Sequence, residues 1–388
     1  MTLKLPVYMD YHATTPVDPR VFDAMYPYFS QEFGNASSID HIFGARAHEA
    51  VEMAREQVAS CINAKPEEII FTSGATESDN IALLGVAERM ATRGDHIITC
   101  ATEHKAVLDT ANHLERIGKT VTYLPVDRYG LVNPDEVEEA ITDRTILISV
   151  MAANNEIGTL APLKEIGIVA KANGVLFHTD AAQAVGHIPL DVKEMGIDLL
   201  SLSGHKVYGP KGIGALYIGG ANPKRKVSPV MFGGGHERGL RSGTYNVPGI
   251  VGLGKALEIA QKEMKVENGR FRKWTKQMFE SFKGEIEGVT RNGHPEKRLA
   301  HNLNVCFPGI EGKALTHLLR TDVAISTGSA CTTSSVEPSH VLKAIGLDES
   351  NIFSAVRFGL GRFNTEEEIE HCINMVISCS KTLRRVSD

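Results

Sequence analysis

Two charged residues near the middle of the chain, Lys206 and Asp180, have types and surroundings that suit chemistry on a bound cofactor. Lys206 lies in the segment SGHKVYGPKG directly after an apolar run, and Asp180 ends the apolar run VLFHTD. In enzymes that use pyridoxal 5'-phosphate (PLP), a lysine forms a Schiff base with the cofactor and an acid holds its pyridine nitrogen. The pair therefore predicts a PLP site. The alternatives are a surface lysine in a turn and an aspartate that caps a helix.

The reactivity of Lys206 depends on its pKa. An ordinary lysine has a pKa of about 10.4 and is protonated at neutral pH. Burial and a neighbouring cation lower that pKa, and His205 is the neighbour that the sequence offers. We therefore expect a buried Lys206 amine beside His205.

The segment FTSGATESDN, residues 71–80, predicts a phosphate site. A short strand runs into a turn and then a helix, whose N-terminus presents free amides and partial positive charge. Thr76 adds a hydroxyl, and Ser203 and His205 flank Lys206 as further phosphate donors. A plain helix cap is the alternative interpretation. The glycine-rich segment GGGHERGLRSGT is a second candidate for a close approach to phosphate, against the alternative of a flexible surface loop.

Four other polar residues are candidates for the same site. His104, just past an expected strand, can stack on an aromatic cofactor and move protons, although a lone histidine is more often structural. Asn155 can bond a phenolic oxygen or a substrate carboxylate, or simply form a turn. Gln183 lies three residues after Asp180 and can bond the phenolate oxygen. Arg357 can bind a carboxylate bidentately, or form a surface salt bridge.

One cysteine, Cys331, lies in a context that favours reaction over packing. Its segment, STGSACTTSS, is small and polar, whereas Cys61 and Cys306 lie in apolar surroundings. Only a small fraction of an ordinary thiol is ionised at neutral pH, so a reactive thiol needs nearby cations or a base. We predict a nucleophilic or sulfur-carrying role for Cys331.

These residues require an α/β scaffold. Short apolar segments alternate with helical patterns, such as the one that starts at Asn133 with a cap residue, a proline and acids. This alternation predicts a mostly parallel sheet covered on both faces, with ligands at the carboxyl ends of its strands. The expected strands are 69–73, 96–101, 120–125, 145–150, 175–180, 198–203 and 214–219.

A second, smaller domain is expected beyond the sheet. A charged amphipathic helix over residues 256–285 leads to expected strands at 302–307 and 323–326. A terminal helix is expected over residues 366–385. Its two cysteines, Cys372 and Cys379, lie seven residues apart on one face and are expected to be small core residues.

Composition narrows the class of protein. The chain has 388 residues, 42% of them hydrophobic and 23% charged, with a net charge of −6. The acidic balance disfavours direct nucleic-acid binding. Asp10 interrupts the N-terminus too early for a signal peptide, and no apolar run is long enough to cross a membrane. The six cysteines have no metal-like spacing, which favours reduced thiols in a cytoplasmic protein and no metal site.

Taken together, the motifs resemble those of the cysteine desulfurases, the NifS/IscS family of class-V aminotransferases. The resemblance covers nearly the whole chain, and the segment around Cys331 is similar to the long-loop, housekeeping branch. The motifs that carry it are DYHATTP, TSGATESDN, TEHKAVLD, NNEIG, HTDAAQAVG, SGHKVYGPKGIGALY, GGGHERGLRSGT, TGSACTTSSVEPSHVL and RFGLGRFNTEEEI. It implies PLP fold type I, with a large domain at 16–260 that holds a seven-stranded sheet. It also implies a small α+β domain made of 1–15 and 261–388, with the cysteine loop at about 326–337.

The resemblance also implies an activity, the conversion of L-cysteine to L-alanine by a homodimer. Sulfur then leaves as a persulfide on Cys331, toward an acceptor or iron–sulfur scaffold protein. Its implied site residues are Lys206, Cys331 and His104 for catalysis, Ala75, Thr76, Ser203, His205 and Thr244 for the phosphate, Asp180 and Gln183 for the ring, and Asn155 and Arg357 for the substrate carboxylate.

Two departures and two alternatives accompany the resemblance. His12 stands where relatives often have Ser or Asn, and the chain stops at Asp388 without the tail with which housekeeping members dock a scaffold. A selenocysteine lyase or other PLP β-eliminase is one alternative, although a simple eliminase needs no thiol. A largely non-catalytic sulfur-relay subunit is the other, and the intact Lys206 and Cys331 argue against it.

Overall fold

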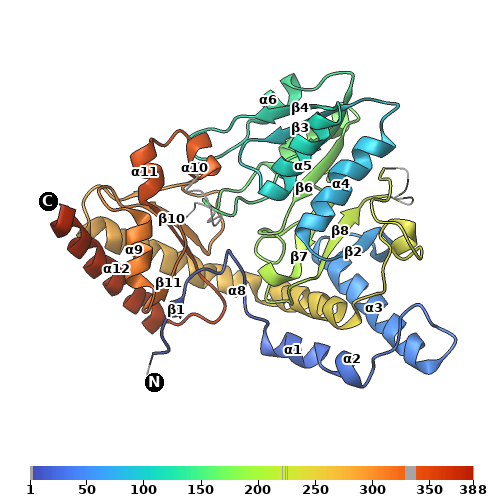
Figure 1. Ribbon diagram of the computed structural model, residues 1–388, viewed down its shortest axis with the longest axis horizontal. Coiled ribbons are helices and arrows are strands. Elements are labelled where there is room, and N and C mark those ends of the chain that lie inside the picture. Colours follow the sequence, from blue (N-terminus) through green and yellow to red (C-terminus); the bar gives the residue numbers. More distant parts are fainter. Residues whose placement is uncertain (1–2, 221, 223, 225, 328–337, 388) are drawn as a thin grey trace.

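The computed structural model describes residues 3–387 apart from 221, 223, 225 and 328–337. The chain forms a larger α/β part around one sheet and a smaller α+β part beside it, as Figure 1 shows. The strands of the main sheet are β2 (Ile69–Thr72), β3 (His96–Cys100), β4 (Thr120–Leu124), β5 (Thr145–Ser149), β6 (Leu176–Asp180), β7 (Leu199–Ser203) and β8 (Gly214–Ile218).

The seven strands lie in the order β2-β8-β7-β6-β5-β3-β4. All neighbouring pairs are parallel except the two that involve β8, which runs antiparallel to β2 and β7. Every strand expected from the apolar segments is present, with ends that differ by one or two residues. The predicted α/β class with a mostly parallel seven-stranded sheet is therefore confirmed.

Helices cover both faces of this sheet. Its strands are buried on both faces, because alternate residues along each strand pack into two separate hydrophobic cores. Phe177 and Leu200 pack in the core that includes Val58, whereas Leu199 packs with Ile81 on the opposite face. The helices of this part are α1 (Pro19–Met25), α2 (Pro27–Ser30), α3 (Ile42–Cys61), η1 (Pro66–Glu68), α4 (Ala75–Arg89), α5 (Lys105–Arg116), α6 (Pro134–Glu139), α7 (Leu163–Ala172), η2 (Gly204–Lys206) and η4 (Glu237–Gly239).

The smaller part is built on a three-stranded antiparallel sheet in the order β12-β10-β9 and on a parallel pair, β1 with β11. Its core contains Cys372 and Cys379, as expected for small core residues. The elements are β1 (Val7–Tyr8), β9 (Thr290–Arg291), β10 (Asn302–Cys306), α9 (Gly312–Leu319), β11 (Val323–Ala324), α10 (His340–Ala344), α11 (Glu349–Ser354), β12 (Ala355–Gly359) and α12 (Glu366–Ser387).

One long helix, α8 (Val247–Glu285), runs through both parts (Figure 1). It begins nine residues earlier than the expected start at residue 256. The extra turns are rich in glycine, which lowers intrinsic helix propensity. They are helical because the glycines allow close packing on α3: a Cβ at Gly254 would lie 2.8 Å from the Ala54 Cα. Tertiary packing therefore overrides local propensity here.

The predicted domain limit at residue 260 falls inside α8 and stays a prediction. Among the helices of the described chain, none combines the length and hydrophobicity that crossing a bilayer requires.

Candidate active site

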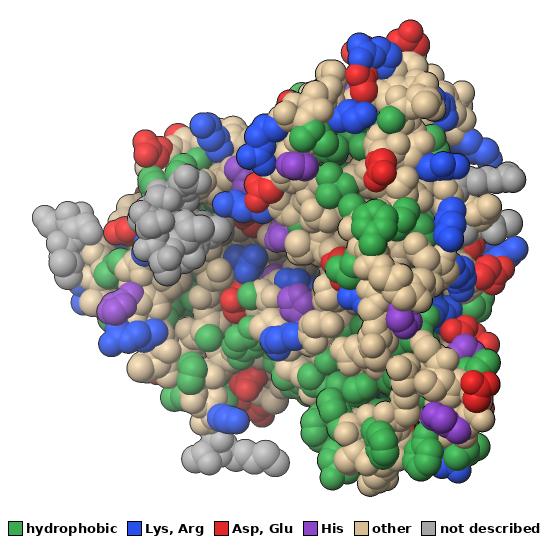
Figure 2. Space-filling model, turned by 45° about the vertical axis from the view of Figure 1, so that its right-hand side comes forward, with side chains coloured by type: hydrophobic (Ala, Val, Ile, Leu, Met, Phe, Trp, Pro, Cys, Tyr) green, Lys and Arg blue, Asp and Glu red, His purple; other side chains and the backbone are tan. Residues whose placement is uncertain are grey.

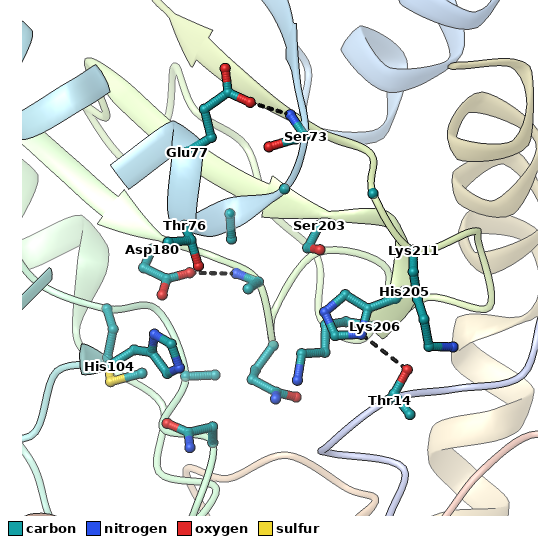
Figure 3. A pocket seen from close by; sticks show the side chains of 18 residues that line it. Thr14, Ser73, Thr76, Glu77, His104, Asp180, Ser203, His205, Lys206 and Lys211 are labelled. Atoms are coloured by element: carbon teal, nitrogen blue, oxygen red, sulfur yellow. Dashed lines mark hydrogen bonds between the residues drawn. The ribbon is translucent and has the colours of Figure 1, made fainter. Parts of the chain in front are cut away.

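A cavity of about 490 Å³ opens at the carboxyl ends of β6 and β7 and at the N-terminus of α4. Figure 2 shows a hollow where histidine and basic side chains gather, and Figure 3 shows the lining residues from close by. The cavity brings together most of the predicted site residues from distant segments. These are Ala75, Thr76, His104, Asn155, Asp180, Gln183, Ser203, His205 and Lys206.

Lys206 lies at the end of η2, the short helix that follows β7. Its Nζ donates to the backbone oxygens of His12 at 2.6 Å and Ala13 at 2.9 Å. Burial, followed by the nearby Arg357 guanidinium, lowers the pKa of Lys206 to about 8. The predicted lowering is therefore present.

The predicted source of that lowering was wrong in part. His205 is not the cation beside Lys206, because burial lowers the pKa of His205 itself to about 4. Its Nδ1 instead bonds the Thr14 Oγ1 at 3.1 Å. Arg357, distant in sequence, supplies the positive charge near Lys206.

Asp180 ends β6 with its carboxylate facing the cavity. The residue is 5% exposed, and its Oδ1 accepts a hydrogen bond of 2.9 Å from the neutral Ala182 amide. Burial raises the pKa of Asp180, opposed by that bond and by the charges of His104 and Lys206. A cation that enters the cavity beside this carboxylate would stabilise its ionised form.

A second buried carboxyl, Asp79 on α4, lies behind Asp180. His178, two residues before Asp180 on β6, bonds Ser149 at 2.8 Å and Ser201 at 3.0 Å, and its Nε2 is 3.6 Å from Asp79. Burial, and then the charge of Asp180, hold the pKa of Asp79 well above its usual range. Burial lowers the pKa of His178 to about 3. Both shifts favour the uncharged forms of Asp79 and His178.

The opposite end of the cavity is suited to an anion. Gly74 precedes α4 without a side-chain cap, so the first amides of the helix stay open toward the cavity. Thr76 and the buried Ser203 add hydroxyls. The acid of the first turn, Glu77, is engaged elsewhere: it accepts from the Ser73 amide at 2.6 Å and pairs with Arg241 at 2.8 Å.

His104 caps the N-terminus of α5 and lines the cavity. Its Nδ1 accepts from the Ala106 amide at 3.1 Å, so the proton of the neutral ring lies on Nε2. Burial lowers the pKa of His104, opposed by Asp180 and reinforced by Lys206. The neutral form of the ring is therefore favoured, and its Nε2 hydrogen can be donated.

Arg357 does not line the cavity but lies directly behind Asn155. It is buried in β12, where Nη1 donates to the Asn155 backbone oxygen at 2.9 Å and Nη2 pairs with Asp10 at 2.8 Å. Arg357 does form a salt bridge, with Asp10, but not a surface one, because the Arg357 side chain is only 9% exposed. The Nε of Arg357 is buried without a partner among the described residues.

Besides Arg357, two predicted residues are not brought into the cavity by the described chain. Thr244 is exposed and does not line it. Cys331 lies outside the described residues. Described residues on either side of its segment bond neighbours of the lining residue Asn155. Ser326 exchanges backbone hydrogen bonds with Arg357, and the Ser339 hydroxyl donates to Glu156 at 2.5 Å.

Sequence reasoning missed several lining residues, among them Thr14, Met151 and Lys211. Thr14 belongs to the quoted segment DYHATTP, so its position beside other site motifs was the available signal. Lys211 likewise belongs to the quoted segment SGHKVYGPKG, whereas nothing in the local pattern of Met151 distinguishes it from a packing residue.

The residues present fit PLP. The cavity volume is within the range of about 300–1,000 Å³ that is usual for small-molecule sites. A buried Asp180 that has no cationic hydrogen-bond partner among the described residues suits a protonated pyridine nitrogen, and the Lys206 amine suits a Schiff base. The open helix terminus with Ser203 suits the phosphate.

Comparisons with known proteins agree with this fit. The class-V aminotransferase family model matches residues 7–372. The chain is 52% identical over 385 residues to "Cysteine desulfurase IscS" of Anaeromyxobacter dehalogenans (strain 2CP-C), which covers 99% of this chain and 95% of that relative. A solved NifS-like protein has a TM-score of 0.89 and 39% identity, covering 96% of this chain and 98% of its own. SspA in complex with cysteine has a TM-score of 0.80 and 41% identity, covering 92% of this chain and 100% of its own. The chain therefore belongs to the cysteine desulfurases, a PLP-dependent group of the class-V aminotransferase family.

Proposed function

We propose that the chain converts L-cysteine to L-alanine and passes the sulfur, as a persulfide on Cys331, to an acceptor protein. The observation that carries this proposal is the meeting of Lys206, Asp180 and His104 in one cavity. Bound PLP supplies an electron sink for negative charge at the substrate Cα. The protein must supply the charges, the proton transfers and the thiol.

Each residue has a proposed role that follows from its surroundings. Lys206, with a pKa of about 8, binds PLP and moves the Cα proton, and the neutral His104 takes part in proton transfer. Asp180 pairs with the pyridine nitrogen, and Gln183 bonds the phenolic oxygen. The phosphate is bound by the Ala75 amide, Thr76, Ser203, His205 and, from the other subunit of a dimer, Thr244. Asn155 and Arg357 bind the substrate carboxylate, supported by the bond between them.

The sulfur step uses Cys331. Its thiolate attacks the substrate sulfur, an S–S bond forms, and the Cβ–S bond of the substrate breaks. The electron pair of the broken bond remains on the carbon, which takes a proton to become the methyl group of alanine. Support comes from residues on either side of its segment, since Ser326 bonds Arg357 and Ser339 bonds Glu156, both of them neighbours of the lining residue Asn155.

Product analysis tests this proposal against a PLP β-eliminase. We expect the PLP-loaded protein to form alanine and protein-bound persulfide in equal amounts during a single turnover with L-cysteine. An eliminase would form pyruvate, ammonia and free sulfide. Mass spectrometry of the product and of the intact chain distinguishes the two, and pyruvate as the main product would overturn the desulfurase proposal.

We also propose a homodimer. An N-terminal apolar patch, visible in Figure 2, exposes side chains of α1, α2, the segment before α3 and the start of α3, and Phe33 alone is 66% exposed. Contiguous apolar surface of this kind is typical of an interface. Its members are Phe22, Tyr26, Phe29, Phe33, Ile39, Ile42 and Phe43. A second copy is the favoured occupant, because Thr244 is exposed and outside its own cavity, as expected of a residue that serves a neighbouring site.

Replacing Phe33 with glutamate is expected to weaken the dimer at least tenfold, because a charge must then be buried in an apolar contact; about tenfold is 1.4 kcal/mol. Sedimentation measures the dissociation constant. Val266→Glu is the matched control, since Val266 is 75% exposed and outside the patch. Equal dissociation constants for Phe33→Glu and wild type would exclude the patch as the interface.

The two parts of the fold support a division into residues 16–260 and a smaller unit made of 1–15 and 261–388, which we propose as the domains. The smaller unit has its own core and includes β1, paired with β11. We further propose a reducing, cytoplasmic location and iron–sulfur scaffold or sulfur-acceptor proteins as partners. The free cysteines of the described chain and the "IscS" name of its relatives support these two points.

A further inference from the structure

Three histidine rings from distant segments stack beside the cavity. The His12 ring lies on His301 at 4.5 Å between centroids, and His301 lies on His187 at 4.2 Å. All three residues are buried. One end of the stack bonds Gln183 and the other end, His187 Nε2, bonds the Lys206 backbone oxygen at 3.0 Å. The stack therefore connects two residues of the proposed PLP site.

The hydrogen bonds between His12 and Gln183 determine the orientation of the Gln183 amide. The His12 backbone oxygen only accepts, so the amide nitrogen of Gln183 must face it, at 2.9 Å. The amide oxygen then faces His12 Nδ1 at 3.0 Å, and Nδ1 must carry the hydrogen. His12 thus binds both ends of one amide, with a backbone acceptor and a ring donor.

The His12 ring is neutral in this environment. Burial comes first among the causes that hold the pKa of His12 well below its usual range, and the charge of Arg357 comes next. The other titratable groups that face the ring, His301, His187 and Lys206, are all cationic when charged. The hydrogen on Nδ1 leaves Nε2 as a bare nitrogen, which is buried without a partner among the described residues.

We propose that His12 is a positioning residue that holds the Gln183 amide with its nitrogen available to the phenolic oxygen of the cofactor. An amide nitrogen has two hydrogens, and one is used by His12. Gln183 lines the cavity, so the second serves a ligand there. A flipped amide would place oxygen against the His12 oxygen and nitrogen against the Nδ1 hydrogen, two repulsive contacts. The inference rests on the role proposed above for Gln183.

The ring and the donor of His12 can be separated by two substitutions. His12→Phe keeps an aromatic ring for the stack but removes the Nδ1 donor. His12→Asn removes the ring but keeps an N–H at the position of Nδ1. A donor to an anionic oxygen lowers the affinity of that oxygen for protons. Loss of the positioned donor should therefore raise the pKa at which the visible absorbance of the bound cofactor titrates.

The test measures this pKa by spectrophotometric titration of the PLP-loaded variants. We expect His12→Phe to raise it by about 0.5–1, the size of one hydrogen bond, and His12→Asn to stay near wild type. Gln183→Ala should raise the pKa at least as much as His12→Phe. The double variant His12→Phe/Gln183→Ala should match Gln183→Ala alone, because the two residues act as one unit.

The outcomes distinguish the positioning role of His12 from the role proposed for Gln183. An unchanged titration in His12→Phe, with a shift in Gln183→Ala, overturns the inference but leaves the role of Gln183 intact. An unchanged titration in Gln183→Ala overturns the proposed role of Gln183 itself. A shift as large in His12→Asn as in His12→Phe would show that stacking, not the donor, matters, and would also overturn the inference. If His12→Phe does not fold, His12→Leu carries the same expectation.

Discussion

Replacing Lys206 with alanine is expected to abolish the covalent attachment of PLP and to lower turnover of L-cysteine by at least about a thousandfold. The loss is large because one amine both binds the cofactor and moves a proton, and proton transfer alone contributes about 10²–10⁴. The amine is suited to both tasks, since burial and Arg357 lower its pKa to about 8. Absorbance of the cofactor and alanine formation measure the two losses.

Reduction with borohydride provides the decisive readout for Lys206. In the wild type it should attach PLP irreversibly to one peptide, the one that contains Lys206, and in Lys206→Ala the chain should gain no mass. Lys211→Ala is the matched control for attachment, because Lys211 lines the same cavity on the same loop. Attachment that persists in Lys206→Ala would show that another amine holds the cofactor and would refute the assignment.

Replacing Cys331 with alanine is expected to leave PLP binding and cysteine binding intact while alanine formation falls by at least about a thousandfold. Loss of an essential reacting group lowers kcat on this scale or more. No other cysteine of the described chain is suited to replace it, because burial raises the thiol pKa of Cys61 to about 11 and of Cys100 to about 12. Burial also raises the pKa values of the remaining three described thiols, Cys306, Cys372 and Cys379.

The matched control is Cys61→Ala, which removes a thiol outside the proposed site and should keep desulfurase turnover. A second variant, Cys331→Ser, keeps the size of the side chain and should be as inactive as Cys331→Ala, because a hydroxyl is not ionised at neutral pH. Alanine formation at the wild-type rate in Cys331→Ala would mean that the thiol does not accept the sulfur. A PLP β-eliminase would then be favoured over a desulfurase as the function of the chain.

The sequence by itself determined the main sheet and the inner set of site residues. Each strand is a short apolar segment between turn signals. Because this pattern involves only neighbouring residues, it can be recognised without knowledge of the fold. Asp180 and Lys206 end or follow such strands, and carboxyl ends of parallel strands meet at one edge of the sheet. Proximity of these residues in space therefore followed from the strand pattern alone.

Tertiary structure decided the properties that depend on partners far away in the chain. Arg357, 151 positions after Lys206, replaces the adjacent His205 as the cation that lowers the lysine pKa. Partial burial lowers the pKa of His205 to about 4 and keeps it neutral, and the extent of burial cannot be read from the local sequence. The early start of α8 is likewise a packing effect on α3.

The contact of His12 with Gln183, at one end of the histidine stack, is the clearest case. His12, His187 and His301 share no sequence motif, and each alone looks like an ordinary buried histidine. Their function depends on which atoms face each other after folding: a backbone oxygen and a ring nitrogen of one residue against the two ends of one amide. Residue types at given positions are fixed by the chain, but hydrogen-bond direction and charge state are set by the environment that only the folded chain creates.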